Sequence, residues 1–148
     1  MAARGPGSAL PAMVPRICDV MSAPVVRVAL TDTPRVAREL MLARGLRHLA
    51  VVDPDTGAAV GVLSDRDLAD PQAPGQMGCR PHTVAELVRS CAPVVRPEVD
   101  ALTAVACVLD AEADALIVVD RARKPLGIVT NHDLARLLTR IHHDPMAG

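Results

Sequence analysis

The stretch GVLSDRDL at residues 61–68 returns as GIVTNHDL at residues 127–134, in the same order and 66 positions later. In both copies an aliphatic run is followed by Ser or Thr, two polar residues, Asp and Leu. This pattern predicts the end of a buried strand and the first turn of a helix whose amino end is capped by the hydroxyl side chain. The chain is therefore predicted to contain one structural unit twice.

Two further blocks repeat upstream of this stretch. APVVR at residues 23–27 is identical to residues 92–96, 69 positions later, and AVVD at residues 50–53 matches IVVD at residues 117–120, 67 positions later. Three blocks in one order at nearly constant spacing indicate an internal duplication. The decrease in spacing from 69 to 66 predicts that the second copy lacks three residues in its loops, where deletions are tolerated.

Each copy has the same predicted order of elements. A short amphipathic turn precedes a strand at residues 25–26 or 94–95, and a helix and two strands that are apolar on both faces follow, as expected where helices cover a sheet. A closing helix begins at Ser64 or Thr130. The apolar stripe of the first helix is predicted to consist of Val36, Ala37, Leu40 and Met41 in copy one and of Leu102, Val105, Ala106 and Leu109 in copy two.

The predicted fold class is α/β (α+β), with two β-α-β-β-α repeats packed through their sheets in pseudo-two-fold symmetry and a cleft between them. Neither repeat is large enough to be expected to fold stably alone. The expected boundaries are a flexible N-terminal tail over 1–15, repeat 1 over 16–70, a linker over 71–81, repeat 2 over 82–141 and a C-terminal tail over 142–148.

Composition excludes several classes of partner. The formal net charge is −1 and Trp, Tyr and Phe are absent, so neither electrostatics nor stacking favours nucleic acid. No apolar run approaches the ~18 residues of a membrane helix, so no membrane association is expected. The four cysteines form no CxxC pair and follow no secretory signal, which indicates reduced thiols and a cytoplasmic protein.

The sequence also argues against metal binding and catalysis. Cys79 and His82 have a CxxH spacing, but no second pair completes a tetrahedral site, so no metal is expected. No P-loop or nucleophile–base pairing is recognisable, and we expect no enzyme. A cysteine nucleophile served by a distant histidine stays open as an alternative.

Taken together, the segments VMSAPVVRV (20–28), LRHLAVVD (46–53) and GVLSDRDL, with the second set CAPVVRP (91–97), LIVVD (116–120) and GIVTNHDL, resemble the CBS domain pair, or Bateman module. The resemblance covers residues 17 to 140. It implies a stand-alone regulatory sensor that binds AMP, ADP, ATP, S-adenosylmethionine or an NAD-type ligand between the repeats, without a required cofactor. It also implies a homodimer that signals to a separate effector protein.

The resemblance assigns the repeated motif to the ligand's sugar. Asp67 and Asp133 would accept hydrogen bonds from ribose hydroxyls, because a carboxylate offers two acceptor oxygens to a vicinal diol. Ser64 and Thr130 would hold the sugar or phosphate edge. The alternative is that both motifs only cap helices, and the two roles are compatible, since a helix amino end with free N–H groups is itself an anion site.

The remaining ligand contacts are also implied by the resemblance. Phosphates would face four basic residues: Arg66, His132, Arg47 and His48. The alternatives are that Arg66 and His132 are solvated residues of a helix first turn and that Arg47 and His48 form a polar pair at a strand edge. The second copy has Asp114 and Ala115 where the first has Arg47 and His48, which predicts two sites of different charge. The base would lie against aliphatic positions near Val25 or Val94. The competing hypothesis is a CBS pair that has lost its ligand and acts only as a dimerisation or docking scaffold.

Overall fold

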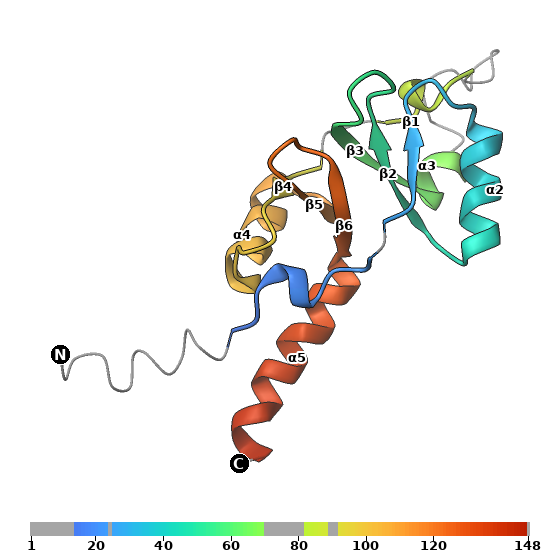
Figure 1. Ribbon diagram of the computed structural model, residues 1–148. Helices are drawn as coiled ribbons and strands as arrows, with labels where there is room; N and C mark the ends of the chain where they lie inside the picture. Colours follow the sequence, from blue (N-terminus) through green and yellow to red (C-terminus); the bar gives the residue numbers. More distant parts are fainter. Residues whose placement is uncertain (1–13, 24, 70–81, 89–91, 148) are drawn as a thin grey trace.

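The computed structural model describes residues 14–23, 25–69, 82–88 and 92–147 of the chain (Figure 1). The expected linker over 71–81 lies outside these residues, as do residues 1–13 of the expected N-terminal tail, Cys79 and Cys91.

The described residues form two copies of one β-α-β-β-α unit, which confirms the predicted fold class. The first copy contains β1 (Arg27–Ala29), α2 (Pro34–Arg44), β2 (His48–Val52), β3 (Ala59–Ser64) and α3 (Asp65–Ala69). The second contains β4 (Val94–Val95), α4 (Ala101–Ala111), β5 (Ala115–Val119), β6 (Pro125–Thr130) and α5 (Asn131–Ala147). Short 3₁₀ helices precede them, η2 (Ile17–Asp19) and η3 (Val84–Glu86). Each sheet has one parallel and one antiparallel pair, in the orders β1-β2-β3 and β4-β5-β6.

Strand pairing corrects the alignment of the two copies. The Ala50 N–H donates to the Val26 carbonyl (3.1 Å), and the Ile117 N–H donates to the Pro93 carbonyl (3.0 Å). The structural counterpart of Val26 is therefore Pro93, 67 positions later, and the identical APVVR segments are not equivalent. Accordingly β1 begins at Arg27 and not at residue 25. Register follows the residue that each strand buries, here Val28 and Val95, and not local identity.

The same two-residue shift corrects the predicted stripe of the second helix. Ala37 and Met41 are buried in α2, and their counterparts Ala104 and Val108 are buried in α4. Leu109, predicted to face the core, is instead 69% exposed. Ala106 and Leu102 are also exposed. The spacing stays 67 as far as β2 and β5 and becomes 66 in β3 and β6. The second copy thus lacks one residue, in the β5–β6 turn, and not three.

The opening turn of each repeat completes the core of the other. The Ile17 N–H donates to the Val99 carbonyl (2.7 Å), and Ile17 is fully buried in a cluster with Leu116. Conversely, the Val84 N–H donates to the Asp32 carbonyl (2.8 Å), and Val84 is fully buried in the cluster of the first sheet. We therefore define lobe 1 as the β1-β2-β3 sheet with α2, α3 and η3, and lobe 2 as the β4-β5-β6 sheet with α4, α5 and η2. The expected repeats are intertwined in space, and Figure 1 shows the blue η2 against lobe 2.

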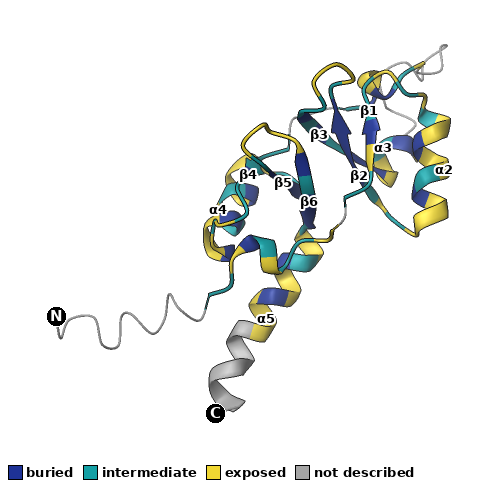
Figure 2. Ribbon diagram, in the orientation of Figure 1, coloured by how far each residue is buried: buried dark blue, intermediate teal, exposed yellow. Residues whose placement is uncertain are grey.

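The two lobes meet through their sheets. Ala50 of β2 clusters with Ala115 and Ile128 of lobe 2, and Ala59 of β3 clusters with Ile117 and Val119. Buried residues follow the strands between the lobes, while α2 presents much exposed surface outward (Figure 2). These apolar contacts hold the two lobes together across the pseudo-two-fold axis.

Helix α5 continues to Ala147, through most of the segment expected as a C-terminal tail over 142–148. Extending an existing helix adds one backbone hydrogen bond for each residue fixed, which favours continuation beyond the packed turns as far as Asp144, whereas Pro145 has no N–H to donate. No helix in the described part of the chain is long and apolar enough to cross a membrane.

Candidate ligand-binding cleft

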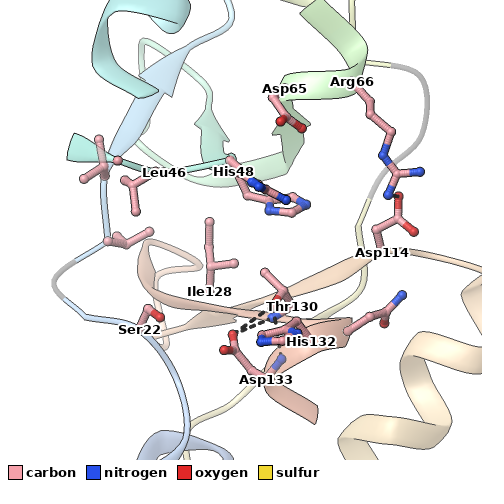
Figure 3. Close-up of a pocket in the computed structure, with 15 residues that line it drawn as sticks. Ser22, Leu46, His48, Asp65, Arg66, Asp114, Ile128, Thr130, His132 and Asp133 are labelled. Atoms are coloured by element: carbon pink, nitrogen blue, oxygen red, sulfur yellow. Dashed lines mark hydrogen bonds and ion pairs between the residues drawn. The ribbon is translucent and has the colours of Figure 1, made fainter. Parts of the chain in front are cut away.

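A cleft of about 750 Å³ opens between the lobes, and Figure 3 shows its lining. Lobe 1 contributes residues 45–47, which link α2 to β2, together with His48 at the start of β2 and the first two residues of α3. Lobe 2 contributes Asp114, Ile128 and residues 130–133. The segment that crosses from η2 to β1 adds Ser22, Val25 and Val26. A molecule bound in this cleft would therefore touch both lobes and their connection.

The amino end of α5 forms a closed capping arrangement on the cleft wall. The Thr130 backbone N–H and the Thr130 hydroxyl both donate to Asp133 Oδ2 (3.0 Å each), and the Asp133 N–H donates to Thr130 Oγ1 (3.3 Å). The capping interpretation thus holds. A carboxylate has about four acceptor positions on its two oxygens, so Asp133 can accept further hydrogen bonds from a diol.

Four basic side chains line the same cleft: Arg47, His48, Arg66 and His132. Burial holds the pKa of His48 below its ordinary value, against the opposing attraction of the Asp65 and Asp114 carboxylates. The imidazole of His48 is therefore neutral near pH 7. Arg66 reaches across the lobes, with its Nη2 3.8 Å from Asp114 Oδ2.

A second cavity of about 110 Å³ is the pseudo-symmetric counterpart of the cleft. Its capping box is Ser64–Asp67, in which the Ser64 N–H donates to Asp67 Oδ2 (2.9 Å) and the Asp67 N–H donates to Ser64 Oγ (3.2 Å). Where the cleft has residues 45–47 (Gly, Leu and Arg), the second cavity has residues 112–114 (Glu, Ala and Asp). Its described lining carries three carboxylates and no arginine or lysine.

The structure gathers seven of the predicted residues in the cleft: Val25, Arg47, His48, Arg66, Thr130, His132 and Asp133. Ser64 and Asp67 lie in the second cavity, which His48 also lines. Arg66 and Asp67, adjacent in sequence, face different cavities because successive helical residues point about 100° apart.

The structure does not bring Val94 together with the other predicted site residues. Val94 lines neither cavity and packs instead near Ile117 and Val119. The counterpart of Val25 is Ala92, which lines the second cavity. In this part of the fold, equivalent residues of the two copies lie 67 residues apart in sequence and not 69.

Sequence reasoning missed several lining residues. Asp65 and Asn131 carried a usable signal, since each directly follows the capping residue of a closing helix. Ser22 and Ile128 carried none. They meet through an isolated antiparallel bridge, in which the Ser22 N–H donates to the Ile128 carbonyl (3.0 Å). Within the described part of the chain no group of His, Cys, Asp and Glu side chains could hold a metal ion.

This architecture defines a class of protein, a tandem-repeat module with a ligand-sized cleft between two pseudo-symmetric lobes. The CBS domain family matches residues 17–72 and 84–140, and the chain belongs to that family.

Solved structures of similar fold are CBS domain pairs. The CBS domain pair of protein MJ0100, in complex with 5′-methylthioadenosine and S-adenosyl-L-methionine, superposes with a TM-score of 0.73 at 21% identity, covering 85% of this chain and 97% of that chain. CBSX2, from Arabidopsis thaliana, in complex with AMP has a TM-score of 0.67 at 26% identity, covering 86% of this chain and 98% of that chain.

A curated relative from Methanosarcina acetivorans, L-aspartate semialdehyde sulfurtransferase, is 31% identical over 128 residues, which is 86% of this chain. A second, homoserine O-acetyltransferase from Methanosphaerula palustris, is 26% identical over 82% of this chain. This chain spans 24% of the length of each relative.

Proposed function

We propose that the chain is a regulatory module that binds one adenosyl ligand in the cleft and transmits the bound state to a separate effector protein. The observation that carries this proposal is the assembly, in one cleft built by both lobes, of the Thr130–Asp133 box with the side chains of Arg47, Arg66 and His132.

The chemistry of the cleft fits the three parts of such a ligand. Asp133 accepts hydrogen bonds from the ribose hydroxyls, as a charged and conformationally fixed acceptor. The aliphatic side chains of Val25 and Ile128 offer an apolar surface to the base. Arg47 and Arg66 lie on the lobe 1 side, where they can contact the 5′ substituent.

Size favours one ligand per chain. The cleft volume falls within the range of small-molecule sites, about 300–1,000 Å³, whereas the second cavity falls below it. The acidic lining of the second cavity also repels phosphate. In this proposal the Ser64–Asp67 box acts as a helix cap only.

The complexes of similar CBS pairs with 5′-methylthioadenosine, S-adenosyl-L-methionine and AMP support the adenosyl class. A ligand that touches both lobes favours one arrangement of them by its difference in affinity for the alternatives. An effector that recognises that arrangement would respond to the ligand, and no bond need be made or broken.

We also propose that the module is a homodimer. Leu42 of α2 and its counterpart Leu109 of α4 are 77% and 69% exposed, and large exposed aliphatic side chains at equivalent positions favour association of like surfaces. Light scattering should give twice the chain mass. Leu42→Glu and Leu109→Glu should return it to the chain mass if these helices form the interface.

Calorimetric titration with AMP, 5′-methylthioadenosine and S-adenosylmethionine tests the proposal. Asp133→Ala should weaken binding by about 10- to 100-fold, the scale of hydrogen bonds to a charged group. Asp67→Ala is the matched control, because it removes the equivalent carboxylate, which accepts from the Ser64 N–H, from the capping box of α3 and should leave affinity within about twofold. Far-ultraviolet circular dichroism verifies that both variants fold.

Two outcomes would contradict the proposal. If no adenosyl compound binds the wild-type chain, the scaffold alternative stands. If both variants lose affinity equally, the carboxylates act through the caps and not through the ligand. An independent check uses the absence of Trp, Tyr and Phe, since the adenine band of a co-purified ligand is then free of protein absorbance.

A further inference from the structure

An ion pair joins the two lobes across the cleft. Arg66 lies on the first turn of α3 in lobe 1, and Asp114 directly precedes β5 in lobe 2, with 3.8 Å between Nη2 and Oδ2. Figure 3 shows Arg66 extended toward Asp114. The other ion pairs recorded in the described part of the chain, Arg35–Glu39 and Arg96–Glu98, each lie within one lobe. The Arg66–Asp114 pair is thus placed where a bound ligand would meet it.

We propose that Asp114 is a charge filter, which holds Arg66 and so makes the cleft prefer adenosyl ligands with an uncharged or zwitterionic 5′ substituent over nucleotide phosphates. This inference rests on the proposed function and deepens it, because it concerns which adenosyl ligand the cleft accepts.

The charges around the cleft support this preference. Its lining carries the carboxylates of Asp65, Asp114 and Asp133 against the guanidinium groups of Arg47 and Arg66. Burial keeps His48 from adding a positive charge near neutral pH. A polyphosphate would therefore enter a cleft whose carboxylates outnumber its guanidinium groups. A zwitterionic substituent can pair its own cation with a carboxylate and its own anion with an arginine.

The ion pair is weak enough for a ligand to displace. Its side chains are 81% and 59% exposed, and 3.8 Å is longer than the about 2.7–2.9 Å of a strong charge-assisted hydrogen bond. A phosphate could take Arg66 from Asp114.

Displacement has a consequence in the second cavity, which Asp114 also lines. There, Asp114 would face the like charges of Asp67 and Glu112 without its counter-charge. This opposition grows with the negative charge of the ligand, because each additional phosphate also meets Asp114 itself. An uncharged substituent leaves the pair intact and meets no such opposition.

The test compares ligands that share adenosine and differ in charge: 5′-methylthioadenosine, AMP and ATP. Titrations at low salt, where exposed charges are least screened, measure their affinities for the wild-type chain and for Asp114→Asn. The variant should bind AMP about two- to fivefold more tightly and gain more for ATP, while 5′-methylthioadenosine changes less than twofold. Because Asp114 is exposed, the substitution leaves the fold intact.

Two further variants sharpen the comparison. Arg66→Gln should weaken AMP more than 5′-methylthioadenosine. Glu39→Gln makes the same change in net charge on α2, in an exposed ion pair that lines neither cavity, and should leave all three affinities unchanged.

The failures of the two proposals are distinguishable. If the ligands bind but Asp114→Asn shifts all three equally, or shifts none, the charge filter is wrong and the proposed function stands. If neither these three ligands nor S-adenosylmethionine binds the wild-type chain, the proposed function is wrong, and the charge-filter proposal is wrong with it.

Discussion

Gly127→Ala tests the contact between the crossing segment and lobe 2. Gly127 lies on β6, where a Cβ atom would stand 2.6 Å from Met21 Sδ and 2.9 Å from the Ser22 carbonyl oxygen. The Met21 side chain can rotate away. The Ser22 oxygen cannot move freely, because it accepts a hydrogen bond from the Ile128 N–H (3.3 Å) while the Ser22 N–H donates to the Ile128 carbonyl (3.0 Å).

The cost of this substitution follows from these contacts. Overpacking of this kind lowers the free energy of unfolding by about 1–3 kcal/mol. Weakening either backbone hydrogen bond of the Ser22–Ile128 bridge adds about 1 kcal/mol. In a chain of this size each kcal/mol corresponds to about 2–4 °C in Tm, so a total of about 2–4 kcal/mol should make Gly127→Ala melt roughly 4–16 °C below wild type. Adenosyl affinity should fall as well, because Ser22 and Ile128 both line the cleft.

Thermal and urea unfolding followed by far-ultraviolet circular dichroism measure this effect, since the chain has no aromatic residue for fluorescence. The paired variant Gly127→Ala with Met21→Ala separates the two contacts. If only the Met21 contact mattered, the pair would melt no lower than Met21→Ala alone. A Gly127→Ala protein that melts within about 1 °C of wild type would refute the close approach of the crossing segment to β6.

Three further substitutions test the fold and the cleft. Because burial lowers the pKa of His48 in the folded chain, the unfolded chain takes up this proton first as pH falls below ~6.5, and stability should decline from there downward. His48→Gln should reduce this decline of Tm with falling pH. His82→Gln, at an exposed position, is the control and should keep it. If Tm falls as steeply in His48→Gln as in His82→Gln, this reasoning is wrong. Glu112→Gly should raise the free energy of unfolding in urea by about 0.5–1 kcal/mol, since Glu112 ends α4 at a left-handed φ of 51°; a loss would show that its side chain stabilises the chain there. Ile17→Ala should lower the free energy of unfolding by about 2–5 kcal/mol and speed amide hydrogen exchange in β5 of lobe 2. Faster hydrogen exchange confined to lobe 1 would contradict the packing of the Ile17 turn against lobe 2.

Much of the fold could be predicted from local patterns. The S/T-x-x-D motif encodes both closing helices because its hydrogen bonds lie within four residues, and the structure forms them at Ser64 and Thr130. The aliphatic runs before each motif became β3 and β6 for the same local reason. The duplication itself fixed the number of lobes, the order of their elements and the family resemblance.

The pairing register of the strands was harder to predict from the sequence, because it depends on partners that are distant along the chain. The identical APVVR segments suggested an equivalence that the sheets do not adopt, since each parallel pairing is decided by which valine reaches the core. That single shift placed Val94 in the predicted site and Leu109 in the predicted core, whereas in the structure Val94 lines neither cavity and Leu109 is exposed.

The sequence by itself determined the repeated unit, the capped helices and the kinds of side chain available for a ligand. Only the tertiary structure decided which of them meet. In the folded chain the turns at Ile17 and Val84 each pack against the lobe built by the other repeat. Arg66 and Asp67 line different cavities, and Arg66 pairs with Asp114. The physical reason is the sequence separation of the interacting residues. Helix caps and helical periodicity depend on residues within one or two turns of chain, whereas the cleft forms only when two sheets bury their apolar faces against each other.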